Sequence, residues 1–102
     1  MNRLTDWGLD SNTLLIFMTD NGGTGGVRVY NAGMRGAKGT PYQGGTRVPA
    51  FFRWTGVFKP GDVNRLTAHI DILPTFAELA GGSIPSGVQL DGRRYAPEQK
   101  RL

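Results

Sequence analysis

A continuous apolar run, NTLLIFM, occupies residues 12–18 and shows no alternation between polar and apolar positions. Polar residues flank it on both sides, with Asp10 and Ser11 before it and Asp20 and Asn21 after it. A short run of this kind is typical of a strand that is covered on both faces, as in the parallel sheet of an α/β protein. The pattern therefore predicts a central strand over residues 12–18.

A second strand and the end of a helix are predicted on either side of this run. The stretch RVPAFFRW predicts a strand over residues 47–54, with Pro49 near its start because proline cannot donate a hydrogen bond to a neighbouring strand. The first ten residues, MNRLTDWGLD, predict the last turns of a helix that stops at Gly8. Three aromatic residues of the second strand are predicted to lie in the core: Phe51, Phe52 and Trp54.

The clearest helical pattern is HIDILPTFAELAGG, which predicts a helix over residues 71–80. Its apolar residues fall on one face, Asp71 is placed to cap its start, and Gly81 and Gly82 end it. His69 precedes this helix and is the single histidine of the chain, for which we expect a structural or surface role. Helices and strands together place the chain in the α/β class.

Glycines interrupt every pattern between residues 22 and 45. The chain has 16 glycines among 102 residues, about twice the usual share of ~7%. A loop this long inside a compact domain is uncommon and is either functional or disordered. We therefore expect residues 22–45 to be mainly loop, and Arg47 at its end to tether it internally.

Two polar residues lie where this loop leaves the first strand. Asp20 and Asn21 follow the predicted carboxyl end of the strand, and ligands bind at that edge of open α/β sheets. Carboxylate and amide oxygens suit Ca²⁺ or Mg²⁺, although Ca²⁺ takes six to eight such ligands. The alternative is that Asp-Asn-Gly-Gly is simply a turn signal. The residues by themselves leave both interpretations open.

Lys38 is the lysine of the glycine-rich stretch. The surrounding GAKGT is not a phosphate-binding P-loop, because that motif places lysine directly between glycine and serine or threonine. An ammonium on a long flexible stem can bind a tetrahedral oxyanion as a point charge. The alternative is an exposed, solvated lysine.

Length, charge and composition exclude several classes of protein. The 102 residues form at most one small domain or part of a larger one. The net charge is +4, but the basic residues are scattered and their longest runs are the pairs Arg93-Arg94 and Lys100-Arg101, which argues against a nucleic-acid partner. The absence of cysteine excludes disulfides and a cysteine nucleophile within these residues. No run approaches the ~20 apolar residues of a membrane span, and the start lacks the apolar core of a signal peptide.

Four blocks of the sequence, taken in order, resemble a known family. They are NTLLIFMTDNGG, RGAKGTPYQGGTRVPAFFRW, HIDILPTFAELAG and LDG. Their order and spacing are similar to the end of the catalytic domain of formylglycine-dependent, arylsulfatase-type sulfatases in the alkaline phosphatase superfamily. The resemblance covers about residues 4–95. It implies an alkaline-phosphatase-like sandwich with a mixed central sheet, of which residues 1–102 would be the C-terminal portion.

The resemblance also implies roles for three residues. The family's Asp-Asn pair, which ligates a divalent cation (usually Ca²⁺, with Mg²⁺ as the alternative), falls on Asp20 and Asn21. The lysine that contacts the substrate sulfate falls on Lys38. The implied activity is hydrolysis of sulfate esters, in proteins that are often secreted, periplasmic or lysosomal.

The chain departs from the family pattern in three respects. It contains neither C-x-P-x-R nor S-x-P-x-R, the signatures from which formylglycine is made, and the family's paired aspartates upstream have no counterpart here. The glutamate common in the lysine block is Gln43. We therefore expect part of a catalytic domain that is inactive alone. The alternatives are an inert truncated product, a small basic binding module, and a hydrolase of phosphate or phosphonate esters.

Overall fold

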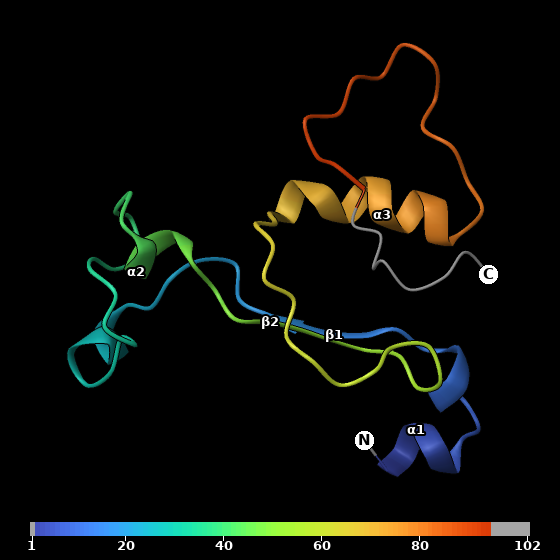
Figure 1. Ribbon diagram of the computed structural model, residues 1–102, viewed down its shortest axis with the longest axis horizontal. Helices are drawn as coiled ribbons and strands as arrows, with labels where there is room; N and C mark the ends of the chain where they lie inside the picture. The colour runs from blue at the N-terminus through green and yellow to red at the C-terminus, as the bar shows by residue number, and fades with distance from the viewer. Residues whose placement is uncertain (1, 95–102) are drawn as a thin grey trace. The chain divides into compact units, whose positions relative to one another are not determined.

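A computed structural model describes residues 2–94 of the chain (Figure 1). The chain divides into two compact units, residues 1–59 and residues 60–102, which are described separately below. The basic pair Lys100-Arg101 lies outside the described residues. The described helices and strands are α1 (Asn2–Asp6), β1 (Leu15–Met18), α2 (Gln43–Thr46), β2 (Ala50–Arg53) and α3 (Ile72–Leu79), with short 3-10 helices at Asp10–Asn12, Gly25–Arg28 and His69–Asp71.

Both predicted strands are present, and they pair with each other. β1 and β2 lie side by side (Figure 1). They run antiparallel, with Ile16 opposite Phe52 and Phe17 opposite Phe51. The first strand begins at Leu15 rather than at residue 12, because residues 10–12 form a 3-10 helix and the Thr13 hydroxyl donates to the Leu9 carbonyl at 2.7 Å. The α/β class is confirmed, whereas the predicted parallel neighbours and mixed sheet are not formed among residues 2–94.

The prediction that three aromatic residues form a core is wrong for the described part of the chain. Phe51 is 65% exposed and Phe52 is also exposed, and Phe17 on β1 is 64% exposed. The rings of Phe17 and Phe51 lie 6.2 Å apart across the strand pair. Trp54 is half-buried, and its ring meets that of Phe58 edge-on at 6.2 Å. A sheet of two strands lacks the covering layer that a hydrophobic run requires to be buried.

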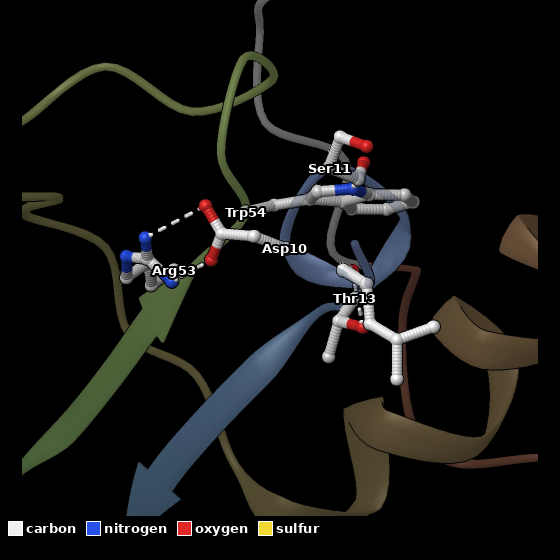
Figure 2. A network of polar contacts seen from close by, with 6 residues as sticks. Asp10, Ser11, Thr13, Arg53 and Trp54 are labelled. Carbon is white, nitrogen blue, oxygen red and sulfur yellow. Dashed lines mark hydrogen bonds and ion pairs between the residues drawn. The ribbon is translucent and has the colours of Figure 1, made fainter. Parts of the chain in front are cut away.

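The end of the strand pair is closed by polar contacts (Figure 2). The guanidinium of Arg53 donates to both carboxylate oxygens of Asp10, at 2.7 and 3.1 Å. Beside it, the indole N–H of Trp54 donates to the carbonyl of Ser11 at 2.9 Å. A two-pronged arginine–carboxylate pair fixes direction as well as distance. These contacts join the segment before β1 to the end of β2.

This ion pair should give Asp10 a distinct titration. The hydrogen bond from Arg53, and next one from Thr55, hold the pKa of Asp10 below its ordinary value of 3.8. A depressed pKa means that the pair stabilises the fold above pH 3.8 and that this stabilisation is lost as pH falls through the lower, folded-state pKa. We expect Arg53→Gln to raise the pKa of Asp10, measured by NMR titration of its carboxyl carbon. An unchanged midpoint would contradict the contact.

The predicted helices are confirmed with small shifts of their ends. α1 ends near Gly8, whose φ of +69° is the left-handed conformation that glycine adopts at helix ends. α3 spans Ile72–Leu79, preceded by a 3-10 turn at His69–Asp71, and Gly81 follows with a φ of +70°. No helix among residues 2–94 is long and apolar enough to cross a membrane.

Asp71 has a different partner from the one that the sequence predicts. Its carboxylate makes no capping bond to α3 and accepts instead from the backbone N–H of Arg93 at 2.7 Å and of Ala68 at 2.9 Å. The bond from Arg93, and next the one from Ala68, lower the pKa of Asp71. A Cβ on Gly92 would lie 2.0 Å from the carbonyl oxygen of Ile70. The LDG block is therefore held against the start of α3 through Asp71.

Candidate functional site

The candidate metal ligands lie directly after β1. Asp20 is exposed and Asn21 is half-buried, and the side-chain amide of Asn21 donates to the carboxylate of Asp20. The NH₂ group of Asn21 therefore faces the carboxylate of Asp20. The strand ends at Met18, which leaves these residues at the carboxyl end that the sequence predicts.

The chain after Asn21 is packed by backbone contacts rather than by side chains. Among residues 2–94 the buried positions are Gly22, Gly44 and Gly45. The amide of Gly22 donates to the carbonyl of Gly45 at 3.0 Å. A Cβ on Gly22 would lie 1.9 Å from the carbonyl oxygen of Gly44, and a Cβ on Gly45 would lie 2.3 Å from that of Thr40. No residue other than glycine fits where these two segments cross.

Lys38 is brought to this crossing through its backbone. Its amide donates to the carbonyl of Gly23 at 2.9 Å. The turn that carries it is closed by Thr40, whose hydroxyl donates to the Ala37 carbonyl at 2.7 Å and accepts from the Ala37 amide at 3.1 Å. The side chain of Lys38 is exposed. The structure thus places the backbone of Lys38 beside Gly23, the second residue after Asn21, although Lys38 and Gly23 are far apart in sequence.

The segments on either side of Lys38 are also tied down. Gly36 has a φ of +87°, and its carbonyl accepts from the side-chain amide of Asn31 at 2.9 Å. The guanidinium of Arg35 stacks over the ring of Tyr42 at 3.9 Å from its centroid, a favourable cation–π contact. Residues 22–45 are mainly loop, as predicted, interrupted by one 3-10 turn and by the start of α2 at Gln43.

Two residues considered from sequence are not part of this arrangement. The side chain of Arg47 is exposed just beyond α2, so the prediction that it tethers the loop is not confirmed. His69 is exposed in the other unit, in agreement with the expected surface role.

The unit of residues 60–102 has a hollow of about 390 Å³, lined by Arg65, Leu66, Asp71, Arg93 and Arg94. None of the candidate site residues lines it.

Asn31 is a residue that sequence reasoning missed. Its side chain is half-buried and contacts two carbonyl groups of the loop. Asparagine is an ordinary turn residue, so its role could not be distinguished from that of the other loop residues. The positive φ of Ala32, 49°, is the signal of an unusual turn, but it is visible only in the structure.

Asp20 and Asn21 fit a divalent cation as part of a site. Both offer hard oxygen atoms, which Ca²⁺ and Mg²⁺ prefer over nitrogen or sulfur. Among residues 2–94 no group of three or more histidine, cysteine, aspartate or glutamate residues is placed to hold a metal ion. Asp20 and Asn21 therefore lie outside any such cluster among the described residues.

Comparison with known proteins settles the family. The sulfatase family model matches residues 1–83. The chain belongs to the sulfatase family. Human arylsulfatase A (Homo sapiens) is 42% identical over 101 residues, 95% of this chain and 20% of its own length. The ulvan-active sulfatase of Formosa agariphila is 36% identical over 96 residues, 93% of this chain and 16% of its own length.

A solved structure supports the same relationship. The crystal structure of Ps i-CgsB in complex with k-i-k-neocarrahexaose superimposes with a TM-score of 0.81 and 34% sequence identity. The match covers 90% of this chain and 21% of that one. This sulfatase chain therefore spans about a fifth of the length of the relatives it matches, and what it shares with them is one part of their catalytic domain.

Proposed function

We propose that this chain is the part of a sulfatase catalytic domain that supplies metal and sulfate contacts for the hydrolysis of a sulfate ester. One observation carries the proposal: the hydrogen bond from the Lys38 amide to the Gly23 carbonyl, 2.9 Å long. It joins the segment that bears the candidate sulfate contact to the segment that bears the candidate metal ligands. Membership of the sulfatase family supports this assignment.

Asp20 and Asn21 would hold the cation through a carboxylate oxygen and an amide oxygen. Ca²⁺ is the expected ion and Mg²⁺ the alternative, because both take oxygen ligands. A bound cation of this kind polarises an ester oxygen and neutralises developing negative charge. For Asn21 to serve as a ligand, its amide must turn from the carboxylate of Asp20, to which it now donates.

Lys38 would bind the sulfate group through its ammonium. A lysine acts on a tetrahedral oxyanion as a point charge with three donors. The Lys38 backbone is held by Gly23 and by the turn that Thr40 closes, so the point from which its side chain extends is fixed. Charges fixed before the reaction stabilise charge that develops in the transition state.

The nucleophile would come from elsewhere in the protein. The chain contains neither C-x-P-x-R nor S-x-P-x-R, the signatures from which the family's formylglycine is made. The substrate class that we propose is a sulfate ester. Two of the relatives support it by name, an arylsulfatase and a sulfatase active on ulvan.

A chimaera tests this function. The 102-residue chain alone should show no turnover of an aryl sulfate. When it replaces the matched segment of human arylsulfatase A, turnover should be restored. Lys38→Ala should then lower kcat/KM by about 100-fold, the usual cost of removing one group that stabilises an oxyanion. Lys59→Ala, at an exposed lysine outside the loop, serves as the matched control.

Two results would contradict the proposal. The first is turnover by the isolated chain that Lys38→Ala abolishes, because a nucleophile would then be present within these residues. The second is a folded, active chimaera in which Lys38→Ala changes kcat/KM no more than Lys59→Ala does. In that case Lys38 would be a solvated surface lysine.

A further inference from the structure

Asn31 closes the first half of the glycine-rich loop on itself. Its side-chain amide donates to the carbonyl of Met34 at 2.7 Å and to that of Gly36 at 2.9 Å. Its own backbone carbonyl accepts from the amide of Met34 at 2.8 Å. The side chain at the start of residues 31–36 thus holds the end of this segment by hydrogen bonds. Both protons of its NH₂ group have an acceptor.

The same amide lies at the crossing with the second half of the loop. A Cβ on Gly44 would lie 2.7 Å from the Asn31 side-chain nitrogen and 2.1 Å from the Gly36 carbonyl oxygen. The amide of Gly44 donates to the carbonyl of Arg35 at 2.8 Å. Asn31 therefore holds Gly36 in the position where the backbone of Gly44 can approach it.

Gly36 in turn sets the start of the turn that carries Lys38. The backbone amide of Ala37 donates to the hydroxyl of Thr40. The next backbone amide, that of Lys38, donates to the carbonyl of Gly23. Only Ala37 separates Gly36 from Lys38. A shift of the Gly36 carbonyl would therefore be transmitted to Lys38 over two peptide bonds.

We propose that Asn31 is the positioning residue for Lys38. The inference rests on the proposed function of Lys38, because Asn31 itself touches no reacting group. Its two hydrogen bonds orient the Gly36 carbonyl, and the Gly36 carbonyl orients the turn from which the ammonium projects. At position 31, a side chain without an NH₂ group would leave the half-buried carbonyl groups of Met34 and Gly36 without this donor. The turn that carries Lys38 could then move.

Amide hydrogen exchange in the ¹⁵N-labelled chain tests the positioning directly. Asn31→Ala should speed exchange of the Lys38 and Gly44 amides by about tenfold or more, since two hydrogen bonds are lost. The amides paired between β1 and β2 should keep their rates. Asn64→Ala, which removes an exposed asparagine in the other unit, should leave all these amides unchanged.

Each of three outcomes would overturn the proposal. In the first, the Lys38 amide of the unmodified chain exchanges as fast as in an unstructured peptide. In the second, Asn31→Ala leaves its rate within twofold. In the third, the sheet amides speed up as much as that of Lys38, in which case Asn31 is a general stabilising residue.

A second measurement separates this inference from the proposed function. Inorganic sulfate is titrated while the NMR signals of the Lys38 side chain are followed. Asn31→Ala should weaken sulfate binding by about tenfold, and it should have no further effect in a Lys38→Ala background, because Asn31 acts through Lys38. Equal weakening in both backgrounds would overturn the proposal. If sulfate never perturbs Lys38, the sulfate-contact assignment fails, and amide exchange still decides whether Asn31 positions the turn.

Discussion

Gly44→Ala is expected to abolish the ordered structure of residues 22–46. The new Cβ would lie 2.1 Å from the Gly36 carbonyl oxygen, where contacts below about 3.0 Å do not occur. The obstacle is backbone, so no side-chain rotation can relieve it. Overpacking of this kind costs about 1–3 kcal/mol, and no large side chain among residues 2–94 is buried to offset it.

The expected result is a collapse of amide shift dispersion over residues 22–46 in the ¹H–¹⁵N spectrum, while the β1 and β2 signals stay in place. Gly25→Ala is the matched control, because a Cβ on Gly25 has no heavy atom within 4 Å. Loss of order in both variants, or in neither, would contradict the packing described for Gly22, Gly44 and Gly45.

The second large effect concerns the metal. In the chimaera with human arylsulfatase A, Asp20→Asn should lower turnover by about 1,000-fold. The substitution keeps the size of the side chain but removes a negative charge beside the cation, and a metal-bound charge contributes several kcal/mol to transition-state stabilisation. Added Ca²⁺ should restore part of the turnover, because weaker binding is overcome by mass action.

Asn12→Asp is the control for this experiment. Asn12 lies in the 3-10 helix before β1, at the other end of the strand from Asp20. It should change turnover by less than about threefold, since surface substitutions have small effects. Equal losses in both variants would show that the chimaera responds to any charge change and not to the metal ligands.

The elements of this fold could be predicted from the sequence because local signals encode them. The two strands and α3 follow from apolar runs bounded by polar residues or glycine. The pairing of β1 with β2 could not be predicted, since a continuous apolar run is equally typical of parallel and antiparallel neighbours. The exposure of Phe51 was missed because hydrophobicity predicts burial only when a covering layer exists.

The candidate site shows a similar division. Strand position, residue chemistry and family resemblance predict Asp20, Asn21 and Lys38 as site residues. The structure brings their segments together through Gly23. Asn31 and the role of Gly44 could not be predicted, because they depend on hydrogen bonds and close approaches between segments that have no common periodicity. In this loop the sequence specifies where the backbone is flexible, but not which carbonyl groups meet.

We propose that Asp20 and Asn21 bind a divalent cation next to the turn that carries Lys38, and manganese titration of the chain tests this binding. Mn²⁺ takes the same oxygen ligands as Ca²⁺ and Mg²⁺ and broadens the NMR signals of nearby nuclei even when binding is weak. Two protein ligands should give a dissociation constant on the order of millimolar, like the loosest calcium sites. We expect the amides of residues 20–23 and of Lys38 to broaden first, and we expect Asp20→Ala to remove this effect. Broadening that begins around Asp62 or Asp91, or that Asp20→Ala leaves unchanged, would contradict it.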